Sequence, residues 1–337
     1  MNQGAERNMI LAGDIGGTNT RLAITDRDSQ GRIRIVREHT FPSQEHPALH
    51  RICQKFLQGG SERAEAACFG VAGPVYQDRC VATNLEWVVD GAQLVQELQI
   101  PRVRVLNDLE ANAYGIACLE SADIDVVREG QPGAVGHAVV ISPGTGLGQA
   151  GMFWDGSRYT PVPTEGGHTD FGPQTPLQFE LAQYLIKQHG RVSWERVVSG
   201  PGLLNIYRFL RDTGRGEQPE GFDSITDRDL PRAISEAALK GRSPLCERAL
   251  DLFLELMGAE AGNMALKYFA LGGIWLGGGI VVELRARLKN TPHFVRGLLN
   301  KGRMREEIEK MPVRILKNDK TALLGAASQA FELRDAS

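Results

Sequence analysis

The feature that most constrains the fold is a glycine-rich turn that occurs three times, each time directly after an apolar, strand-like run. The turns are DIGGTNT at 14–20, SPGTGLG at 142–148 and LGGGI at 276–280. Clustered glycines mark places where the backbone turns sharply or where a ligand comes close to it. The first two turns also carry threonine and lie between two apolar runs. The sequence therefore predicts two β-hairpins of the same plan.

The segments between these turns alternate between strand and helix patterns, which is typical of an α/β fold. Buried strands are predicted at 65–75 and 102–106, each with a helical stretch after it. A long amphipathic helix is predicted at 244–270 and a last helix at 320–333, whereas 213–230 is polar and predicted as loop. Two hairpins of one plan in such a chain indicate two related α/β halves.

Length and composition are those of a globular protein of about two domains. The chain has 337 residues, of which 42% are apolar and 23% charged. A net charge of −3 gives no indication of an electrostatic footprint for DNA or RNA. No apolar run reaches the length of a membrane span, and the amino-terminal MNQGAERNMI has no signal-peptide core. We therefore expect a cytoplasmic protein that binds neither nucleic acid nor membrane.

The cysteines add to this expectation. There are five of them, scattered and without paired spacing: Cys53, Cys68, Cys80, Cys118 and Cys246. This pattern argues against a zinc site and against a disulfide framework, and it fits a reducing compartment.

The glycine turns favour a nucleotide phosphate site, with tight packing of strand ends as the alternative. Backbone N–H groups and hydroxyls in such turns can surround phosphate oxygens, and the carboxylate of Asp14 could hold a metal. A hairpin loop with an Asx turn is the plainer interpretation of the first turn. The third turn lacks hydroxyls and suits the adenine-ribose part of a nucleotide.

Two familiar phosphate motifs are excluded. The chain has no GxxxxGK[ST], so it is not a P-loop NTPase. A GxGxxG does occur at Gly146, Gly148 and Gly151, with Glu165 further on. That fingerprint requires a helix at its third glycine, and the proline and glycine of the following MFWDGSRYTPVP disfavour one. We therefore interpret this match as accidental.

Three polar groups could act on a substrate. Asn107 and Asp108 follow the strand RVRVL, where a carboxylate could accept a proton from a hydroxyl. Considered by itself, Asp108 is better explained as the N-cap of the helix that follows. Glu165 and His168 flank two glycines and could bind sugar hydroxyls or be structural. Glu195 lies in an otherwise apolar run and is either a further sugar contact or a solvated helix residue.

At these residues the chain resembles a known family. DIGGTNTRLA, FGVAGPV, TNLEW, LNDLEANAYG, SPGTGLG, EGGHTDF, ERVVSGPGL and GGIWLGGGI together resemble the bacterial ATP-dependent glucokinases. These enzymes belong to the superfamily of hexokinase, actin and Hsp70-like ATPases. DIGGT is shared across the superfamily, whereas LNDLEA and EGGHTDF in one chain are much more specific. The match extends from about residue 9 to residue 330.

The resemblance implies a fold and an activity. It implies two actin-like, ribonuclease-H-like α/β domains with an interdomain cleft, the first formed by residues 1–118 and 309–337 and the second by 119–308. It also implies ATP-dependent phosphorylation of glucose at the 6-hydroxyl, which gives glucose 6-phosphate and ADP. ATP, Mg²⁺ and glucose are then the ligands, and a homodimer is the expected assembly.

The resemblance also assigns the candidate residues to ligands. The first phosphate loop would be Asp14, Gly16, Gly17 and Thr18, with Asp14 near Mg²⁺ and bound to it through water. The second phosphate loop would be Gly144, Thr145 and Gly146, and the adenosine motif Gly277, Gly278 and Gly279. Glucose would be bound by Asn107, Asp108, Glu165, His168 and Glu195, with Asp108 as the catalytic base.

The chain departs from one related group, the ROK sugar kinases and repressors. That group carries a zinc-binding cysteine cluster after its EGGH-like motif, whereas HTDFGPQTPLQFELA has no cysteine, so we expect no structural zinc. ROK repressors also have an amino-terminal helix-turn-helix, and only 13 residues precede Asp14. Two alternatives stay open, a kinase of another hexose and a glucose sensor without turnover. An actin-like filament protein would leave EGGHTDF unexplained.

Overall fold

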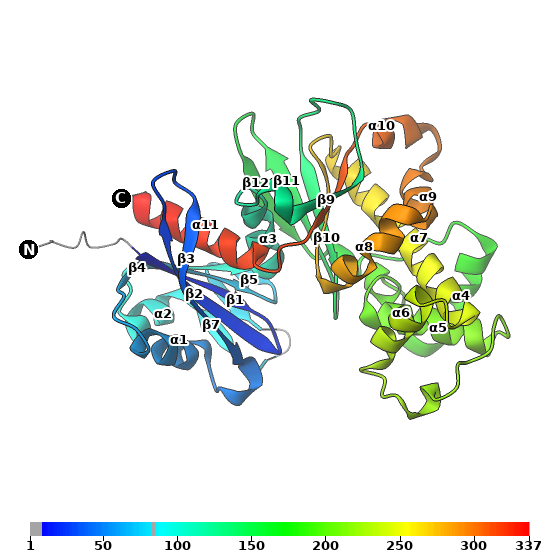
Figure 1. Cartoon of the computed structure of the whole chain (residues 1–337), viewed down its shortest axis with the longest axis horizontal. Coiled ribbons are helices and arrows are strands. Elements are labelled where there is room, and N and C mark those ends of the chain that lie inside the picture. The colour runs from blue at the N-terminus through cyan, green and yellow to red at the C-terminus, as the bar shows by residue number, and fades with distance from the viewer. Residues whose placement is uncertain (1–8, 83–84, 337) are drawn as a thin grey trace, which may run out of the picture. The chain divides into compact units, whose positions relative to one another are not determined.

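The computed structural model describes residues 9–82 and 85–336, so Thr83 and Asn84 of the TNLEW motif lie outside the described residues. The chain forms two compact units (Figure 1). The first comprises the chain up to Asp123 together with the segment from Asn318 onward, and the second runs from Ile124 to Lys317.

The first unit is built on a five-stranded mixed sheet. Its strands are β1 (Met9–Ile15), β2 (Asn19–Arg27), β3 (Ile33–Pro42), β4 (Ala64–Val71) and β8 (Val103–Asn107). They lie in the order β3-β2-β1-β4-β8, antiparallel from β3 to β1 and parallel from β1 to β8. The predicted hairpin and buried strands are therefore confirmed.

Helices cover both faces of this sheet (Figure 1). They are α1 (Leu49–Gln58), α2 (Gly91–Leu98), α3 (Asp108–Ile116) and α11 (Thr321–Asp335). Side chains alternate along β1, so Leu11 and Ile15 pack in one apolar core with α1 and α2, whereas Ile10 and Ala12 pack in another with α3 and α11. The carboxyl-terminal helix is thus part of the first unit.

A small antiparallel sheet completes the first unit. It consists of β5 (Val75–Tyr76), β6 (Arg79–Val81) and β7 (Val88–Asp90), which the sequence analysis does not predict. Strands of two or three residues are too short for a period of two to show in the sequence.

The second unit repeats the plan of the first. Its strands are β9 (Ile124–Arg128), β10 (Ala138–Pro143), β11 (Leu147–Trp154), β12 (Tyr159–Thr164), β13 (Gly273–Leu276) and β14 (Val313–Leu316). The order is β12-β11-β10-β13-β14-β9. Again three antiparallel strands lead into parallel ones, and β9 is added antiparallel at the edge. This confirms the two related α/β halves.

Two details of this sheet bear on the sequence analysis. β11 continues through Gly148 and Gly151, so no helix opens at the third glycine of the GxGxxG match. The rejection of a dinucleotide fingerprint is therefore confirmed. β14 pairs with β13 inside the second unit, although the sequence analysis assigns residues 309–317 to the first domain.

Seven α-helices are described in the second unit: α4 (Pro176–His189), α5 (Gly200–Asp212), α6 (Leu230–Leu239), α7 (Pro244–Tyr268), α8 (Gly279–Asn290), α9 (His293–Leu299) and α10 (Arg305–Glu309). The long α7 matches its prediction and has more buried residues than any other described helix. It begins at Pro244, and the hydroxyl of Ser243 accepts from the N–H of Cys246. Over the described chain, no helix is both long and apolar enough to span a membrane.

Glycines allow α3 and α11 of the first unit to pack closely. A Cβ atom at Gly325 would overlap the carbonyl oxygen of Ala111, and one at Gly115 would overlap that of Thr321. We expect Gly325→Ala to lower the free energy of unfolding by roughly 1–3 kcal/mol, because the added methyl group forces the helices apart. Urea denaturation measures this. Glu332→Ala, on the exposed side of α11, is the control, and equal stability of the two variants would contradict the packing argument.

Candidate functional site

The first predicted phosphate loop is the turn between β1 and β2. The N–H of Gly16 donates to the carbonyl oxygen of Asn19 at 2.9 Å. The turn is also held from outside, because the hydroxyl of Ser43 donates to the Gly16 carbonyl at 2.7 Å and the Ser43 N–H donates to the Thr18 carbonyl at 2.8 Å. Ser43 is fully buried and was missed in the sequence, where a lone serine at a strand end gives no signal.

Asp14 lies one residue before the end of β1, opposite Arg21 on β2 and beside Gly70 on β4. Burial raises the pKa of its carboxyl to about 6, the charge of Arg21 lowers it in part, and the charge of Asp319 raises it. Arg21 is itself bonded to Asp319 at 3.0 Å. The site therefore holds an incompletely compensated negative charge, which a divalent cation would neutralise.

Asn107 and Asp108 lie where β8 passes into α3. The side-chain oxygen of Asn107 accepts from the N–H of Leu109 at 2.9 Å, and its amide donates to the Gly73 carbonyl at 3.0 Å. Asp108 is the first residue of the helix, and its Oδ1 also accepts from Leu109 at 2.9 Å. The cap that the sequence analysis gave to Asp108 thus belongs to Asn107, one residue earlier.

The first unit brings Asp14 and Asp108 to the same edge of its sheet. β1, β4 and β8 are parallel, so their carboxyl ends meet there, with Gly70 of β4 between the two acids. A Cβ atom at Gly70 would lie 2.8 Å from the Cβ of Ala111 and 3.7 Å from the Cα of Asp108. The absence of a side chain at Gly70 therefore lets the start of α3 approach β4.

The second predicted phosphate loop is the turn between β10 and β11. The N–H of Gly144 donates to the Gly146 carbonyl at 2.8 Å, and the Gly144 carbonyl accepts from the N–H of Gly200 at 2.8 Å. Thr145, at the tip, is exposed. The start of α5 therefore supports this turn from behind.

The predicted adenosine motif lies against the same strand end. The N–H of Gly277 donates to the Ile141 carbonyl at 2.9 Å. Gly278 has φ +88°, and a Cβ atom there would lie 2.8 Å from the Pro143 carbonyl oxygen. By contrast, a Cβ atom at Gly144 or Gly279 would meet no described atom within 4 Å. These two backbones are open to a ligand, and no described side chain caps the start of α8 at Gly279.

The predicted glucose residues of the second unit lie beside the turn between β10 and β11. Two short 3₁₀ turns, η3 (Gly166–His168) and η4 (Trp194–Arg196), are joined where the N–H of Trp194 donates to the Thr169 carbonyl at 3.0 Å. Glu195 accepts from the N–H of Leu147 at 3.0 Å. Glu165 and His168 are exposed. The second unit thus gathers its predicted glucose residues around the start of β11.

Comparison with known proteins identifies the family. A family model described as glucokinase matches residues 11–332. The chain belongs to the glucokinase family. Accordingly it is an enzyme, and its activity is the ATP-dependent phosphorylation of glucose.

Individual relatives agree with this assignment. A glucokinase of Nostoc punctiforme is 39% identical over 96% of this chain and 99% of its own length. The crystal structure of a glucokinase from an Antarctic psychrotroph has a TM-score of 0.83 and 31% identity, covering 96% of this chain and 99% of its own. A ROK glucokinase of Streptomyces griseus, in complex with glucose and AMPPNP, has a TM-score of 0.62 at 22% identity, covering 96% of this chain and 100% of its own. The chain thus has the actin-like ATPase fold of glucokinases and is distinct from the ROK group.

The raised pKa of Asp14 predicts a pH-dependent cost to stability. The pKa in the folded chain lies above the ordinary 3.8, so the folded chain binds this proton more tightly than the unfolded chain does. The ionised carboxylate therefore costs free energy above about pH 6, and this cost is absent below about pH 4. We expect Asp14→Asn to stabilise the ligand-free protein by about 1–3 kcal/mol at pH 8 and by little at pH 4.

Urea unfolding at the two pH values measures this, and Asp28→Asn is the matched control. Hydrogen bonds from the backbone and the side chain of Arg32 lower the pKa of Asp28, so that variant should lose stability at pH 8. A loss of stability in Asp14→Asn at pH 8 would show that its charge is fully compensated.

Proposed function

We propose that the candidate residues of the first unit and those of the second, here called the two half-sites, act on one glucose and one MgATP. Asp108 is the general base. The γ-phosphoryl group passes from ATP to the 6-hydroxyl of glucose, which gives glucose 6-phosphate and ADP. One observation supports this most strongly. Asp108 stands at the carboxyl edge of the first sheet, the edge that also carries Asp14 and the first glycine turn.

The base is oriented by the backbone around it. The N–H of Leu109 donates to Oδ1 of Asp108, which fixes the direction of the carboxylate at the first turn of α3. As the 6-hydroxyl attacks the γ-phosphorus, Asp108 accepts its proton. The transition state of phosphoryl transfer is loose, so positioning and charge neutralisation provide most of the catalysis.

The glycine turns are proposed to bind ATP. In the first unit these are Gly16, Gly17 and Thr18, and in the second Gly144, Thr145 and Gly146 for phosphate and Gly277, Gly278 and Gly279 for adenosine. The open backbone at Gly144 and Gly279 fits this role, because no neighbouring side chain keeps a ligand from it. The N–H of Gly144 is bonded within its turn, whereas that of Gly279, at the uncapped start of α8, can donate to a phosphate or ribose oxygen.

The residues present also fit Mg²⁺. Asp14 supplies one half-buried carboxylate, and among the described residues no group of three or more His, Cys, Asp or Glu could hold a metal alone. Mg²⁺ commonly binds through one or two carboxylates, waters and phosphates, which matches a single acid that meets the ion through water. When bound, the ion neutralises phosphate charge, while Asp14 holds it beside the first turn.

Glucose is proposed to be oriented by Asn107, Glu165, His168 and Glu195. The amide of Asn107 uses one donor and one acceptor position within the protein, so a second N–H and a second lone pair remain for a sugar hydroxyl. Such bonds discriminate between sugars, because a missing hydroxyl would leave a protein group unpaired.

The base is tested with Asp108→Asn. The amide keeps an oxygen that can accept from Leu109, so the fold should be retained, but it cannot take the proton. We expect kcat to fall by about 10²- to 10⁴-fold with the glucose KM little changed. Asp123→Asn is the control, because that carboxylate likewise accepts a backbone N–H, from Glu120 at 3.0 Å, away from the site. Near-normal kcat in Asp108→Asn would show that another group accepts the proton.

The preferred sugar is tested by ADP release with glucose, fructose, mannose and N-acetylglucosamine in parallel. We expect glucose to give the highest kcat/KM, because Glu165, His168 and Glu195 are the residues that the family resemblance assigns to this sugar. A higher value for another hexose would keep the mechanism and change the substrate.

The homodimer is also a proposal. Phe179 and Ile186 are 55% and 49% exposed and lie two turns apart on α4, which offers an apolar patch to a second copy. Light scattering should give twice the monomer mass, and the Phe179→Glu variant should give a monomer. A monomeric wild type would exclude this assembly.

A further inference from the structure

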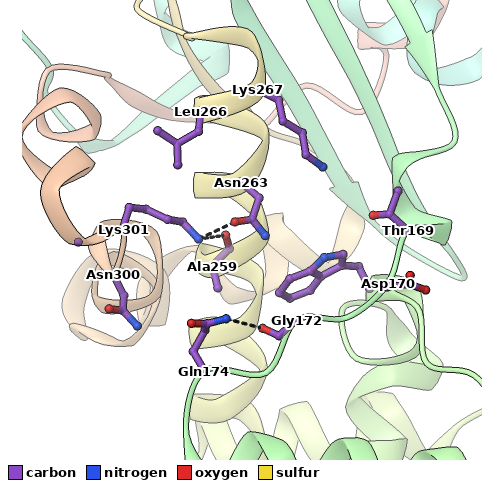
Figure 2. Close-up of a pocket in the computed structure, with 12 residues that line it drawn as sticks. Thr169, Asp170, Gly172, Gln174, Ala259, Asn263, Leu266, Lys267, Asn300 and Lys301 are labelled. Atoms are coloured by element: carbon purple, nitrogen blue, oxygen red, sulfur yellow. Dashed lines mark hydrogen bonds between the residues drawn. The ribbon is translucent and has the colours of Figure 1, made fainter.

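A carboxylate buried in α7 has no role in the mechanism above. Glu260 has no exposed surface, yet its two oxygens accept from two amides: Gln149 donates to Oε1 at 2.8 Å, and Asn263 donates to Oε2 at 2.9 Å. Figure 2 shows the continuation of this network, where Lys301 donates to the Asn263 side chain at 2.7 Å and to the Ala259 carbonyl at 2.8 Å. The network ends in a pocket of about 640 Å³.

Stability alone does not account for this arrangement. Burial raises the pKa of Glu260, and the hydrogen bonds from Asn263 and Gln149 lower it only in part. Replacing a buried charged network by apolar residues of the same volume is often neutral or stabilising. We therefore expect the network to have a function other than stability, and Gln149, at the end of the network opposite Lys301, indicates what it is.

Gln149 lies under the turn that carries Glu165 and His168. It is 3% exposed, and in the β11–β12 ladder it pairs with Thr164, the residue before the turn. A Cβ atom at Gly166 would overlap Oε1 of Gln149. The amide of Gln149 thus has Glu260 on its nitrogen side and the backbone of the turn on its oxygen side.

Gly167, the next residue of the turn, also packs directly against β11. A Cβ atom at Gly167 would overlap the carbonyl oxygen of Leu147, which also belongs to β11. The N–H of Leu147 in turn donates to Glu195. One short stretch of β11 therefore supports both the 165–168 turn and Glu195.

We propose that Glu260 is a positioning residue for glucose binding: it fixes the amide of Gln149, on which the turn bearing Glu165 and His168 rests. This rests on the proposed function, in which those two side chains bind glucose. A carboxylate is required because two N–H donors converge on it, one on each oxygen. An amide at position 260 has one acceptor atom, so one of the two donors would face another N–H group.

The first measurement is hydrogen exchange of the ligand-free Glu260→Gln variant. We expect faster exchange in peptides that cover 164–169, where the N–H groups of His168 and Thr169 are bonded within the turn. Peptides that cover the first glycine turn, in the other unit, should be unchanged. Unchanged exchange at 164–169 would overturn the proposal.

The second measurement is steady-state kinetics. We expect the glucose KM of Glu260→Gln to rise about tenfold, while the ATP KM and the kcat at saturating glucose stay within about twofold. A purely structural defect would lower the fraction of active protein and leave both KM values alone. Equal changes in the two KM values would also overturn the proposal.

Two further variants sharpen the test. Glu255→Gln is the matched control, because Glu255 lies on the same helix and accepts from the amide of Gln178 at 3.3 Å, away from the turn. It should leave the exchange and both KM values unchanged. The double variant Gln149→Glu/Glu260→Gln reverses donor and acceptor, so the new amide at position 260 would donate to the new carboxylate at position 149 and accept from Asn263. It should restore the glucose KM to within about threefold.

The outcomes separate this proposal from the proposed function. If the wild type fails to phosphorylate glucose, the proposed function fails, and the exchange data still decide whether Glu260 positions the turn. If Glu260→Gln does not fold, the double variant decides: wild-type exchange at 164–169 supports the pairing, and fast exchange in a folded double variant overturns it.

Discussion

Close approach of the backbone to the carboxyl ends of the central strands is the constraint on which both half-sites depend. At Gly70 the missing side chain lets α3 reach β4 and brings Asp108 to the sheet edge. At Gly146 a Cβ atom would lie 2.7 Å from the carboxylate of Glu195. At Gly166 and Gly167 the turn that carries His168 lies flat on β11. The candidate side chains can lie this close to the strands because glycines occupy these points of contact.

Much of this fold follows from the sequence because its elements are long or repeated. The two hairpins show the same order of apolar run, glycine turn and apolar run, and α7 is long enough for helical periodicity to be plain. The elements that were missed are short or lack a period of their own. β9 and β14 pair with each other across nearly the whole second unit, which no local pattern reports. α6 begins at Leu230, where a polar segment predicted as loop ends.

Several of the candidate residues that the sequence revealed, among them Asp14, Asn107 and Asp108, stand at strand ends, where polar side chains after an apolar run are conspicuous. Those it did not reveal act through partners far away in the chain. Ser43 holds the first turn across 27 positions, and Gln149 meets Glu260 across 111. Serine and glutamine are ordinary residues in such segments, so only the folded structure shows what they contact. The position of the helix cap, at Asn107 rather than Asp108, likewise depends on the backbone where β8 ends, which the sequence locates only to within a residue or two.

The two carboxylates of Glu260 and Asp14 are both desolvated, but their surroundings differ. Glu260 is enclosed, and each of its oxygens accepts a hydrogen bond from an amide of the protein. Asp14 has Arg21 opposite it, but no hydrogen-bond donor to its carboxylate is found among the described residues, and Arg21 is bonded to Asp319. A desolvated carboxylate without such donors lowers the stability of the folded chain unless a cation binds beside it. Both carboxylates have a raised pKa from desolvation, and they differ in the hydrogen-bond donors around them. This difference agrees with the two proposals, that Glu260 positions its neighbours and that Asp14 holds a cation.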